Sequence, residues 1–278
     1  MSEDLATRPS PAVLSDVLCA IDGTRTSFRA VARLCELLTP DARLTILLCT
    51  NESGGAGQWA TASISPARGR ETLIRAAELA GDAGLHAETV LDPHGPPVQR
   101  VLAQAASHAL LAMGAPIVPR WVGRLVGGVA VEAVHQLPSS LLIAREVPLP
   151  AGERVLLALD GSGDAPGLTE IAVDAARRLD RGIVVVHAVG VEGRSEPHHF
   201  DAQREHLAEA LGAAPEVVIE AERPADLILR IARERQASLI VMGSRRIGGV
   251  RALGSVSERV AHRARCSVLV IRPEEQGT

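Results

Sequence analysis

Short runs of apolar residues alternate along the chain with longer stretches in which apolar positions recur every three or four residues. Near-continuous runs of Val, Ile and Leu are typical of strands that are buried on both faces of a parallel sheet. The longer stretches predict amphipathic helices, of which residues 168–179 are the clearest, because their apolar side chains fall on one stripe. The alternation of the two patterns favours βαβ units and therefore an α/β fold.

The predicted elements form two similar sets. In the first half the predicted strands are residues 17–21, 44–49, 87–91, 110–113 and 141–144, and the predicted helices are 27–38, 71–83, 98–107 and 128–135. In the second half the strands are 155–159, 183–188, 217–220, 239–242 and 268–271, and the helices are 168–179, 200–211, 225–235 and 255–264. Residues 51–67 are rich in small residues and lack periodicity, so they are predicted to form a flexible connection.

Short motifs repeat along the chain in the same order. Residues 17–23 (VLCAIDG) match 155–161 (VLLALDG), residues 111–114 (LAMG) match 240–243 (IVMG), and residues 140–145 (SLLIAR) match 267–272 (SVLVIR). Because 278 residues is about the length of two domains, we expect two copies of one unit in tandem. Pro148 and Pro150 interrupt helix and sheet between the copies, so the predicted domains are 1–147 and 148–278.

Composition excludes several classes of function. The net charge is only −4 and aromatic residues make up 1% of the chain, so it lacks both the basic face and the stacking aromatic residues of a nucleic-acid-binding protein. All 29 basic residues are Arg. Without Lys the chain cannot be a P-loop NTPase, a protein kinase or a Schiff-base enzyme. Any phosphate must be bound by backbone N–H groups, Ser, Thr or Arg.

The cysteines and the apolar runs indicate the cellular compartment in which the protein is expected. Cys19, Cys35, Cys49 and Cys266 are isolated in the sequence, which indicates thiols in a reducing compartment. No apolar run is long enough to span a membrane, and the first residues do not resemble a secretion signal. We therefore expect a cytoplasmic protein with no membrane partner. No His and Cys residues have metal-ligand spacing, so no metal site is predicted.

Two acidic residues occupy equivalent positions after the first predicted strand of each copy. Asp22 and Asp160 should lie at the carboxyl end of a parallel strand, where α/β sheets bind ligands, and either could accept hydrogen bonds from a ribose or a base. The same residues could instead cap the turn or helix that follows. His187, at the end of another predicted strand, is interpreted as a hydrogen-bonded structural residue rather than a catalyst.

The segment after the fourth strand of the second copy is rich in Gly and Arg. Glycines between residues 243 and 254 permit close approach of the backbone to a ligand. Ser255 begins a predicted helix whose first N–H groups favour a phosphate, and its spacing from Glu258 also fits a capping box. Three arginines of this segment are interpreted either as solvated side chains or as phosphate ligands: Arg245, Arg246 and Arg251.

ALDGS at residues 158–162 and VMGSRRIGGVRALGSVSERV at residues 241–260 resemble the universal stress protein family. The resemblance extends over nearly the whole chain and implies two flavodoxin-like (adenine nucleotide alpha hydrolase-like) doubly wound parallel five-stranded sheets in tandem. Family members dimerise through their last strands, and many bind ATP through an Asp after the first strand and a G-x-x-G-x(9)-G-[ST] loop after the fourth. The resemblance implies a cofactor-binding site at Asp160, Gly243, Gly254 and Ser255, to which we add Arg246 and Gly248 of the same loop.

Both copies depart from the family motif. In the second copy Arg246 replaces the middle glycine, and seven residues rather than nine separate it from Gly254. An Arg at this position loses the backbone freedom of glycine but can itself bind phosphate. In the first copy Ile117 replaces the middle glycine, Gly128 replaces the final Ser, and prolines at 116 and 119 remove N–H donors. We therefore expect the first copy to be degraded as a nucleotide site.

The resemblance implies a cytoplasmic ATP-binding stress-response or signalling protein that is not an enzyme, with tandem domains that form an internal pseudo-dimer. Its expected partners are an adenine nucleotide and either another protein or a second copy of the chain; whether Mg²⁺ accompanies the nucleotide is left open. The alternative is a protein-interaction module that has lost nucleotide binding. A slow ATPase is a weaker third hypothesis, because the sequence shows no base paired with a nucleophile and no carboxylate cluster for Mg²⁺.

Overall fold

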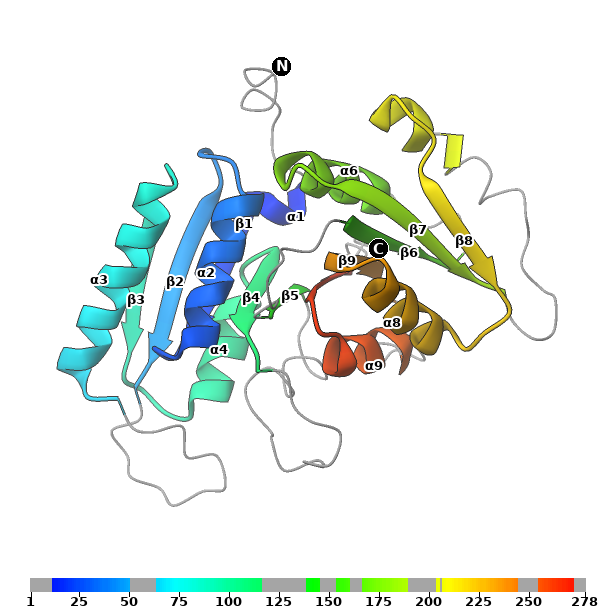
Figure 1. Ribbon diagram of the computed structural model, residues 1–278. Coiled ribbons are helices and arrows are strands. Elements are labelled where there is room, and N and C mark those ends of the chain that lie inside the picture. The colour runs from blue at the N-terminus through cyan, green and yellow to red at the C-terminus, as the bar shows by residue number, and fades with distance from the viewer. Residues whose placement is uncertain are drawn as a thin grey trace, which may run out of the picture. The chain divides into compact units, whose positions relative to one another are not determined.

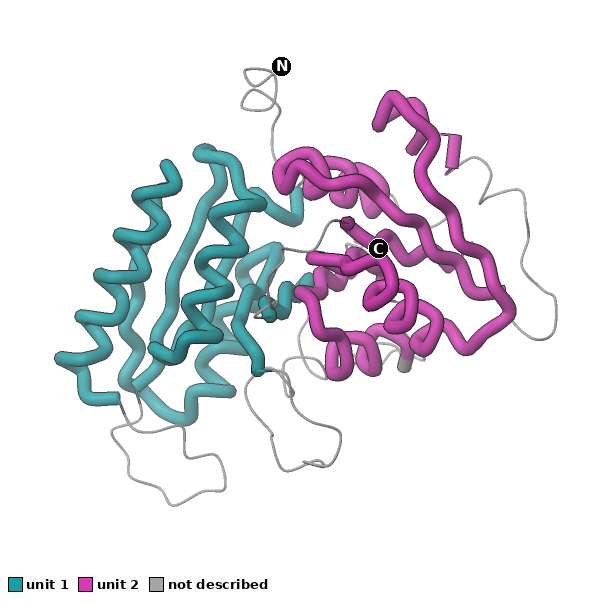
Figure 2. Tube along the Cα trace, viewed as in Figure 1, with its two compact units in different colours: residues 1–146, 249–252 teal, residues 147–248, 253–278 magenta. Residues whose placement is uncertain are grey.

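The computed structural model describes residues 12–50, 64–116, 139–145, 154–160, 167–189, 204–205, 207–244 and 255–272. These residues form two compact units, one before residue 147 and one after it, coloured teal and magenta in Figure 2. Each unit contains a parallel sheet with helices packed against it, so the predicted tandem α/β fold is confirmed. The boundary predicted between residues 147 and 148 lies outside the described residues and stays a prediction.

The first unit is a parallel sheet in the order β3-β2-β1-β4-β5 (Figure 1). Its strands are β1 (Asp16–Ile21), β2 (Arg43–Cys49), β3 (Ala87–Asp92), β4 (Leu110–Gly114) and β5 (Ser140–Ala144). Its described helices are α1 (Ala12–Ser15), α2 (Arg25–Leu37), α3 (Pro66–Asp82) and α4 (Pro97–Ala105). The strand order reverses between β1 and β4, as in a doubly wound sheet, and ligands of such folds bind at the carboxyl ends of the strands at that point.

The second unit repeats this arrangement in the order β10-β9-β6-β7-β8. Its strands are β6 (Arg154–Leu159), β7 (Gly182–Ala188), β8 (Glu216–Glu220), β9 (Ala237–Gly243) and β10 (Ser267–Ile271). Its described helices are α6 (Leu168–Arg178), α8 (Pro224–Glu234) and α9 (Ser255–Arg263), and residues 207–211 are also helical. The strand order reverses between β6 and β9, which is therefore the corresponding ligand edge of this unit.

A side-chain cap explains where α3 begins. The Ser65 hydroxyl accepts a hydrogen bond from the Arg68 N–H, and Pro66 is the first helical residue. The helix therefore starts five residues earlier than its periodicity predicts, and the prediction of a flexible connection through residue 67 is wrong at its end. Ser followed by Pro is a helix-start signal that periodicity alone misses. Periodicity also does not predict the short α1, and the predicted helix over 128–135 lies outside the described residues.

The inner strands form the core of each unit. Residues 44–48 of β2 and 155–159 of β6 are all buried, which confirms the prediction of strands covered on both faces. That prediction is wrong for β3 and β8, in which most residues are partly or fully exposed. These two strands lie at the outer ends of their sheets, so they have a neighbouring strand on one side only. Ile219 of β8 is accordingly 49% exposed.

Candidate functional site

Strand register brings Asp160 and Gly243 to the same edge of the second unit. β6 pairs with β9 so that Ala158 lies opposite Met242, and Asp160 and Gly243 follow these residues toward the carboxyl ends of the two strands. Both Asp160 and Gly243 are exposed. Among the other predicted site residues, Ser255 begins α9, whereas Arg246, Gly248 and Gly254 lie outside the described residues.

The corresponding acidic residue of the first unit stabilises a turn. The Asp22 carboxylate accepts hydrogen bonds from the Thr24 N–H at 2.9 Å and from the Thr24 hydroxyl at 2.5 Å. The Thr24 hydroxyl oxygen in turn accepts from the Ser27 N–H at 3.3 Å, at the start of α2. Asp22 therefore has the capping role that the sequence left as the alternative to ligand binding.

Gly114 and Gly243 occupy equivalent positions in different surroundings. A β-carbon on Gly114 would lie 1.8 Å from the main-chain oxygen of Thr26 and 2.6 Å from the nitrogen of Ser27. A β-carbon on Gly243 would meet, among the described residues, only the Leu168 side chain within 4 Å, at a distance of 3.9 Å. The backbone of α2 therefore fills the carboxyl end of β4, whereas the end of β9 is exposed.

The length of the connection after the first strand of each unit explains this difference. Arg25, the first residue of α2, follows Asp22 by three positions, whereas Leu168, the first residue of α6, follows Asp160 by eight. The shorter connection places the first turn of α2 directly against the end of β4. The expectation of a degraded first site rests on the motif after β4, and the sequence does not reveal this difference in helix placement.

The turn after β1 of the first unit lies beside residues in and just before α3. Gly23 has a φ of +77°, which favours glycine, and it connects Asp22 to Thr24. A β-carbon on Gly23 would lie 3.5 Å from the side chain of Thr72 and 3.7 Å from that of Ile64. Residues in and just before α3 therefore lie within van der Waals distance of this turn, while Asp22 and Gly23 remain exposed.

An ion pair between a buried carboxylate and a partly exposed arginine links the end of β3 to α4. The Arg100 Nε donates a hydrogen bond to the Asp92 carboxylate at 2.7 Å, and the His94 N–H donates to the same carboxylate at 2.9 Å. Burial alone would raise the pKa of Asp92, but these hydrogen bonds outweigh it and hold the pKa below its ordinary value. Arg230 of α8 binds Glu220 at the end of β8 in the equivalent place. Because both units use this link, we interpret it as structural.

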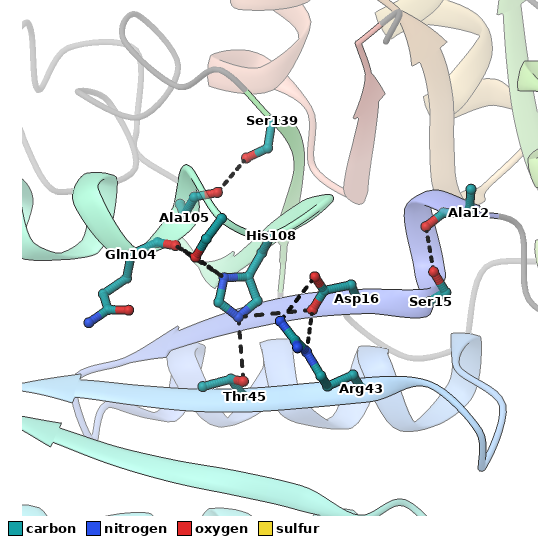
Figure 3. A network of polar contacts seen from close by, with 10 residues as sticks. Ala12, Ser15, Asp16, Arg43, Thr45, Gln104, Ala105, His108 and Ser139 are labelled. Atoms are coloured by element: carbon teal, nitrogen blue, oxygen red, sulfur yellow. Dashed lines mark hydrogen bonds and ion pairs between the residues drawn. The ribbon is translucent and has the colours of Figure 1, made fainter.

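A second polar network, shown in Figure 3, lies at the amino ends of β1 and β2. Arg43 donates two hydrogen bonds to Asp16, at 3.0 and 3.3 Å. The Nδ1 atom of the buried His108 ring lies 3.0 Å from the main-chain oxygen of Gln104, and its Nε2 atom lies 3.4 Å from the Thr45 hydroxyl. Because the Gln104 oxygen can only accept, Nδ1 carries a proton. This network is at the opposite edge of the sheet from Asp22, and it ties the end of α4 to the strands.

Other residues singled out in the sequence have structural surroundings. His187 is buried and its Nδ1 lies 3.0 Å from the Leu159 oxygen, which confirms its interpretation as a hydrogen-bonded structural residue. All four cysteines lie among the described residues, and none forms a disulfide. Arg245 and Arg251 lie outside the described residues. In the part of the chain that the structure describes, no three His, Cys, Asp or Glu side chains are arranged to hold a metal ion. None of the described helices is both long and apolar enough to cross a bilayer.

Known proteins with similar sequences and structures define the class to which this fold belongs. The model of the universal stress protein family matches residues 152–272. Universal stress protein Rv2623 of Mycobacterium tuberculosis is 30% identical over 213 residues, which cover 69% of this chain and 70% of that protein. The crystal structure of a universal stress protein from Archaeoglobus fulgidus covers 96% of this chain and 100% of that chain, with 23% identity and a TM-score of 0.74. Another structure from Archaeoglobus fulgidus, in complex with dAMP, covers 44% of this chain and 98% of that chain, with 24% identity and a TM-score of 0.35.

The two parallel sheets, each with a reversal of strand order, place this chain in the class of tandem doubly wound α/β proteins. Within that class the chain belongs to the universal stress protein family, as its match to Rv2623 and to the family model shows. The resemblance drawn from the sequence motifs is therefore confirmed.

Proposed function

We propose that this chain is a stress-response or signalling protein that binds ATP in its second unit and acts by changing its protein partner rather than by catalysis. The contrast between Gly114 and Gly243 is the observation that carries the proposal. Backbone fills the strand end at Gly114, whereas Gly243 and Asp160 are exposed at the ends of two paired strands. One nucleotide per chain is expected, because α2 backbone fills the end of β4 in the first unit and the exposed Asp22 carboxylate is engaged with Thr24.

Each proposed site residue has its own role in this proposal. Asp160 accepts hydrogen bonds from the ribose or the base, because a carboxylate at this edge faces the ligand crevice. Gly243 lets the nucleotide approach the backbone closely. Ser255 and the first N–H groups of α9 bind a phosphate with the help of the helix dipole. Arg246 contributes its positive charge to the phosphate site. Gly248 and Gly254 let the loop backbone approach the phosphate closely.

The proposed location is the cytoplasm. The four cysteines are distributed over both units and none is in a disulfide, which is typical of proteins from a reducing compartment. A nucleotide that is abundant in that compartment is then available to the site.

The two units form an internal pseudo-dimer in this proposal. The last strands, β5 and β10, are apolar, and proteins tend to pair or cover such strands when they would otherwise form an edge. We expect these strands to lie side by side and antiparallel about an approximate two-fold axis. In a chain without its native cysteines, Leu142→Cys and Leu269→Cys together should form an intramolecular disulfide. If no combination of one cysteine in β5 and one in β10 forms an intramolecular disulfide, this arrangement is contradicted.

The test of the nucleotide site compares two aspartates. Protein purified without added ligand should release ATP when it is denatured, and added ATP should raise its unfolding temperature by a few degrees, since a ligand at 100 times its Kd stabilises by about 2.7 kcal/mol. Asp160→Ala should abolish this shift, and the control Asp22→Ala should retain it. A shift that survives Asp160→Ala but disappears in Asp22→Ala would place the nucleotide in the first unit.

The second candidate function is a protein-interaction module that binds no nucleotide. The departure of the loop from the family motif favours it, because Arg246 replaces a glycine and the following segment is two residues shorter. A wild-type protein that shows no ATP-induced shift, and that captures the same partner with and without ATP, would support this candidate over the first.

A further inference from the structure

A buried histidine near the end of β7 contacts the strand that leads to Asp160. His187 is 4% exposed, and its Nδ1 lies 3.0 Å from the main-chain oxygen of Leu159, the residue directly before Asp160. Because a main-chain oxygen can only accept, Nδ1 carries the proton of this hydrogen bond. The bond joins a side chain of β7 to the last residue of β6, at the edge where the second unit is proposed to bind its nucleotide.

This hydrogen bond constrains the peptide group between Leu159 and Asp160. The Leu159 carbonyl and the Asp160 N–H belong to one planar group, so a bond to the oxygen also determines the direction of the N–H. Leu159 is buried, whereas Asp160 is exposed. The α-carbon of Asp160 is part of the same plane, so His187 constrains the point from which the Asp160 side chain leaves the sheet.

The first unit has a leucine in the place of His187. Ile21 pairs with Leu48 in the first unit as Leu159 pairs with His187 in the second. Leu48 is completely buried, and a β-carbon on Gly69 of α3 would lie 3.2 Å from its side chain, so it packs against that helix. The same strand end therefore forms with an apolar residue. Because burial of a polar ring is costly without hydrogen bonds, the imidazole indicates a requirement of the second unit and not of the fold.

We propose that His187 is a positioning residue of the nucleotide site in the second unit. It holds the Leu159 carbonyl, and thereby the peptide group from which Asp160 presents its carboxylate to the ribose or the base. This role rests on the proposed function and requires no contact between His187 and the nucleotide. Its effect falls on recognition of the base and ribose and not on that of the phosphates, because Asp160 is assigned to the base and ribose.

The first experiment uses two substitutions that separate the hydrogen bond from packing. Leu fills the space of the ring without a donor, whereas Asn has an amide N–H that can take the place of the Nδ1 proton. His187→Leu should weaken the binding of ATP and of adenosine by the same factor of about ten, because the hydrogen bond that orients Asp160 is lost. His187→Asn should bind both ligands more tightly than His187→Leu does.

Val185→Ala is the matched control for this experiment. Val185 is 1% exposed and lies two residues before His187 on the same face of β7, so its truncation disturbs packing but leaves the hydrogen bond to Leu159 in place. Its affinity for adenosine should stay close to that of wild type. A loss in His187→Leu that is confined to ATP, no recovery in His187→Asn, or an equal loss in Val185→Ala would overturn the proposal.

A second measurement does not depend on nucleotide. In the ligand-free protein, the NMR resonances of the Leu159 carbonyl carbon and the Asp160 amide report the hydrogen bond and the orientation of the peptide group. Both should move in His187→Leu, and both should move less in His187→Asn and in Val185→Ala. If wild type binds neither ATP nor adenosine, the proposed function fails, and these resonances still decide whether His187 holds the peptide group of Asp160. Resonances that are unchanged in His187→Leu would overturn that role even where nucleotide binds.

Discussion

The main-chain oxygen of Thr26 lies so close to Gly114 that a β-carbon on this residue would be 1.8 Å from it. Gly114 does not have a positive φ, so glycine is required here by space and not by backbone conformation. Gly243 is in the same Met-Gly motif at the end of β9, where the nearest described atom would be 3.9 Å from a β-carbon. One motif therefore serves helix packing in the first unit, whereas its glycine is exposed in the second.

Replacement of these two glycines should have unequal effects on stability. Gly114→Ala should lower the free energy of unfolding by about 3 kcal/mol, because the start of α2 must move to accept the methyl group. Gly243→Ala should change it by less than about 1 kcal/mol. Urea unfolding followed by circular dichroism compares the two variants directly. Equal costs would mean that the two strand ends do not differ in packing.

The ion pairs at the two edges of the first sheet should also differ in strength. Asp92 has a 5% exposed side chain, and Asp92→Asn should cost about 2 kcal/mol at neutral pH because a buried charged hydrogen bond to Arg100 is lost. Asp16 and Arg43 are 28% and 65% exposed, so the control Asp16→Asn should cost less than about 1 kcal/mol. Chemical unfolding of the two variants at one ionic strength measures both values. A larger cost for Asp16→Asn would reverse this ranking.

Acid should remove the contribution of Asp92. Its pKa in the folded state is below the ordinary value of 3.8, so the carboxylate stabilises the fold at pH values above 3.8. This stabilisation is lost as the pH falls from there through the folded-state pKa. The difference in unfolding free energy between wild type and Asp92→Asn should therefore shrink between neutral pH and about pH 3. A difference that stays constant over this interval would show that the negative charge of Asp92 does not stabilise the folded state.

The sequence predicts the strands well because the inner ones consist mainly of buried apolar residues, a pattern that requires no knowledge of distant contacts. It predicts less of the site. Asp160 and Gly243 are found by their motifs, and their meeting at one edge follows from parallel pairing. The Met-Gly motif of the first unit does not predict that backbone fills the end of β4 at Gly114, because this depends on where the first turn of α2 packs. The link between Asp92 and Arg100 is missed for a similar reason, because its geometry is set by the turn between β3 and α4.

Two cysteines should be unreactive in the folded chain. Burial raises the pKa of Cys19 to about 12 with a smaller contribution from Cys35, and burial together with the Asp92 carboxylate raises that of Cys49 to about 12. The thiolate is the nucleophile, and on the order of one thiol in ten thousand is ionised at about pH 8 in such a site. Iodoacetamide should therefore leave Cys19 and Cys49 unmodified until urea is added, as mass spectrometry of the peptides can measure. Rapid labelling of either residue without urea would contradict its raised pKa.

Bound ATP should stay largely intact. Phosphoryl transfer depends on groups that neutralise the moving charge and place the attacking water in line. The proposed site offers Asp160, backbone N–H groups and Arg246, which suit the charge of the bound nucleotide, and the chain has no Lys to act as a P-loop lysine does. Binding can still produce an output, because a differential affinity of about 1 to 3 kcal/mol between the ATP-bound and ATP-free states is enough to change a protein partner.

The measurement is a steady-state ATPase assay with Mg²⁺, performed beside a pull-down with and without ATP. Phosphate release should remain well below about 1 per second, the low end of typical enzymes, and the set of captured partners should change with ATP. Asp160→Ala should abolish the ATP dependence of capture, while Asp22→Ala, whose carboxylate is engaged with Thr24, should preserve it. Turnover at or above about 1 per second that disappears in Asp160→Ala would instead identify the protein as an enzyme, because contamination by another ATPase would not respond to that substitution.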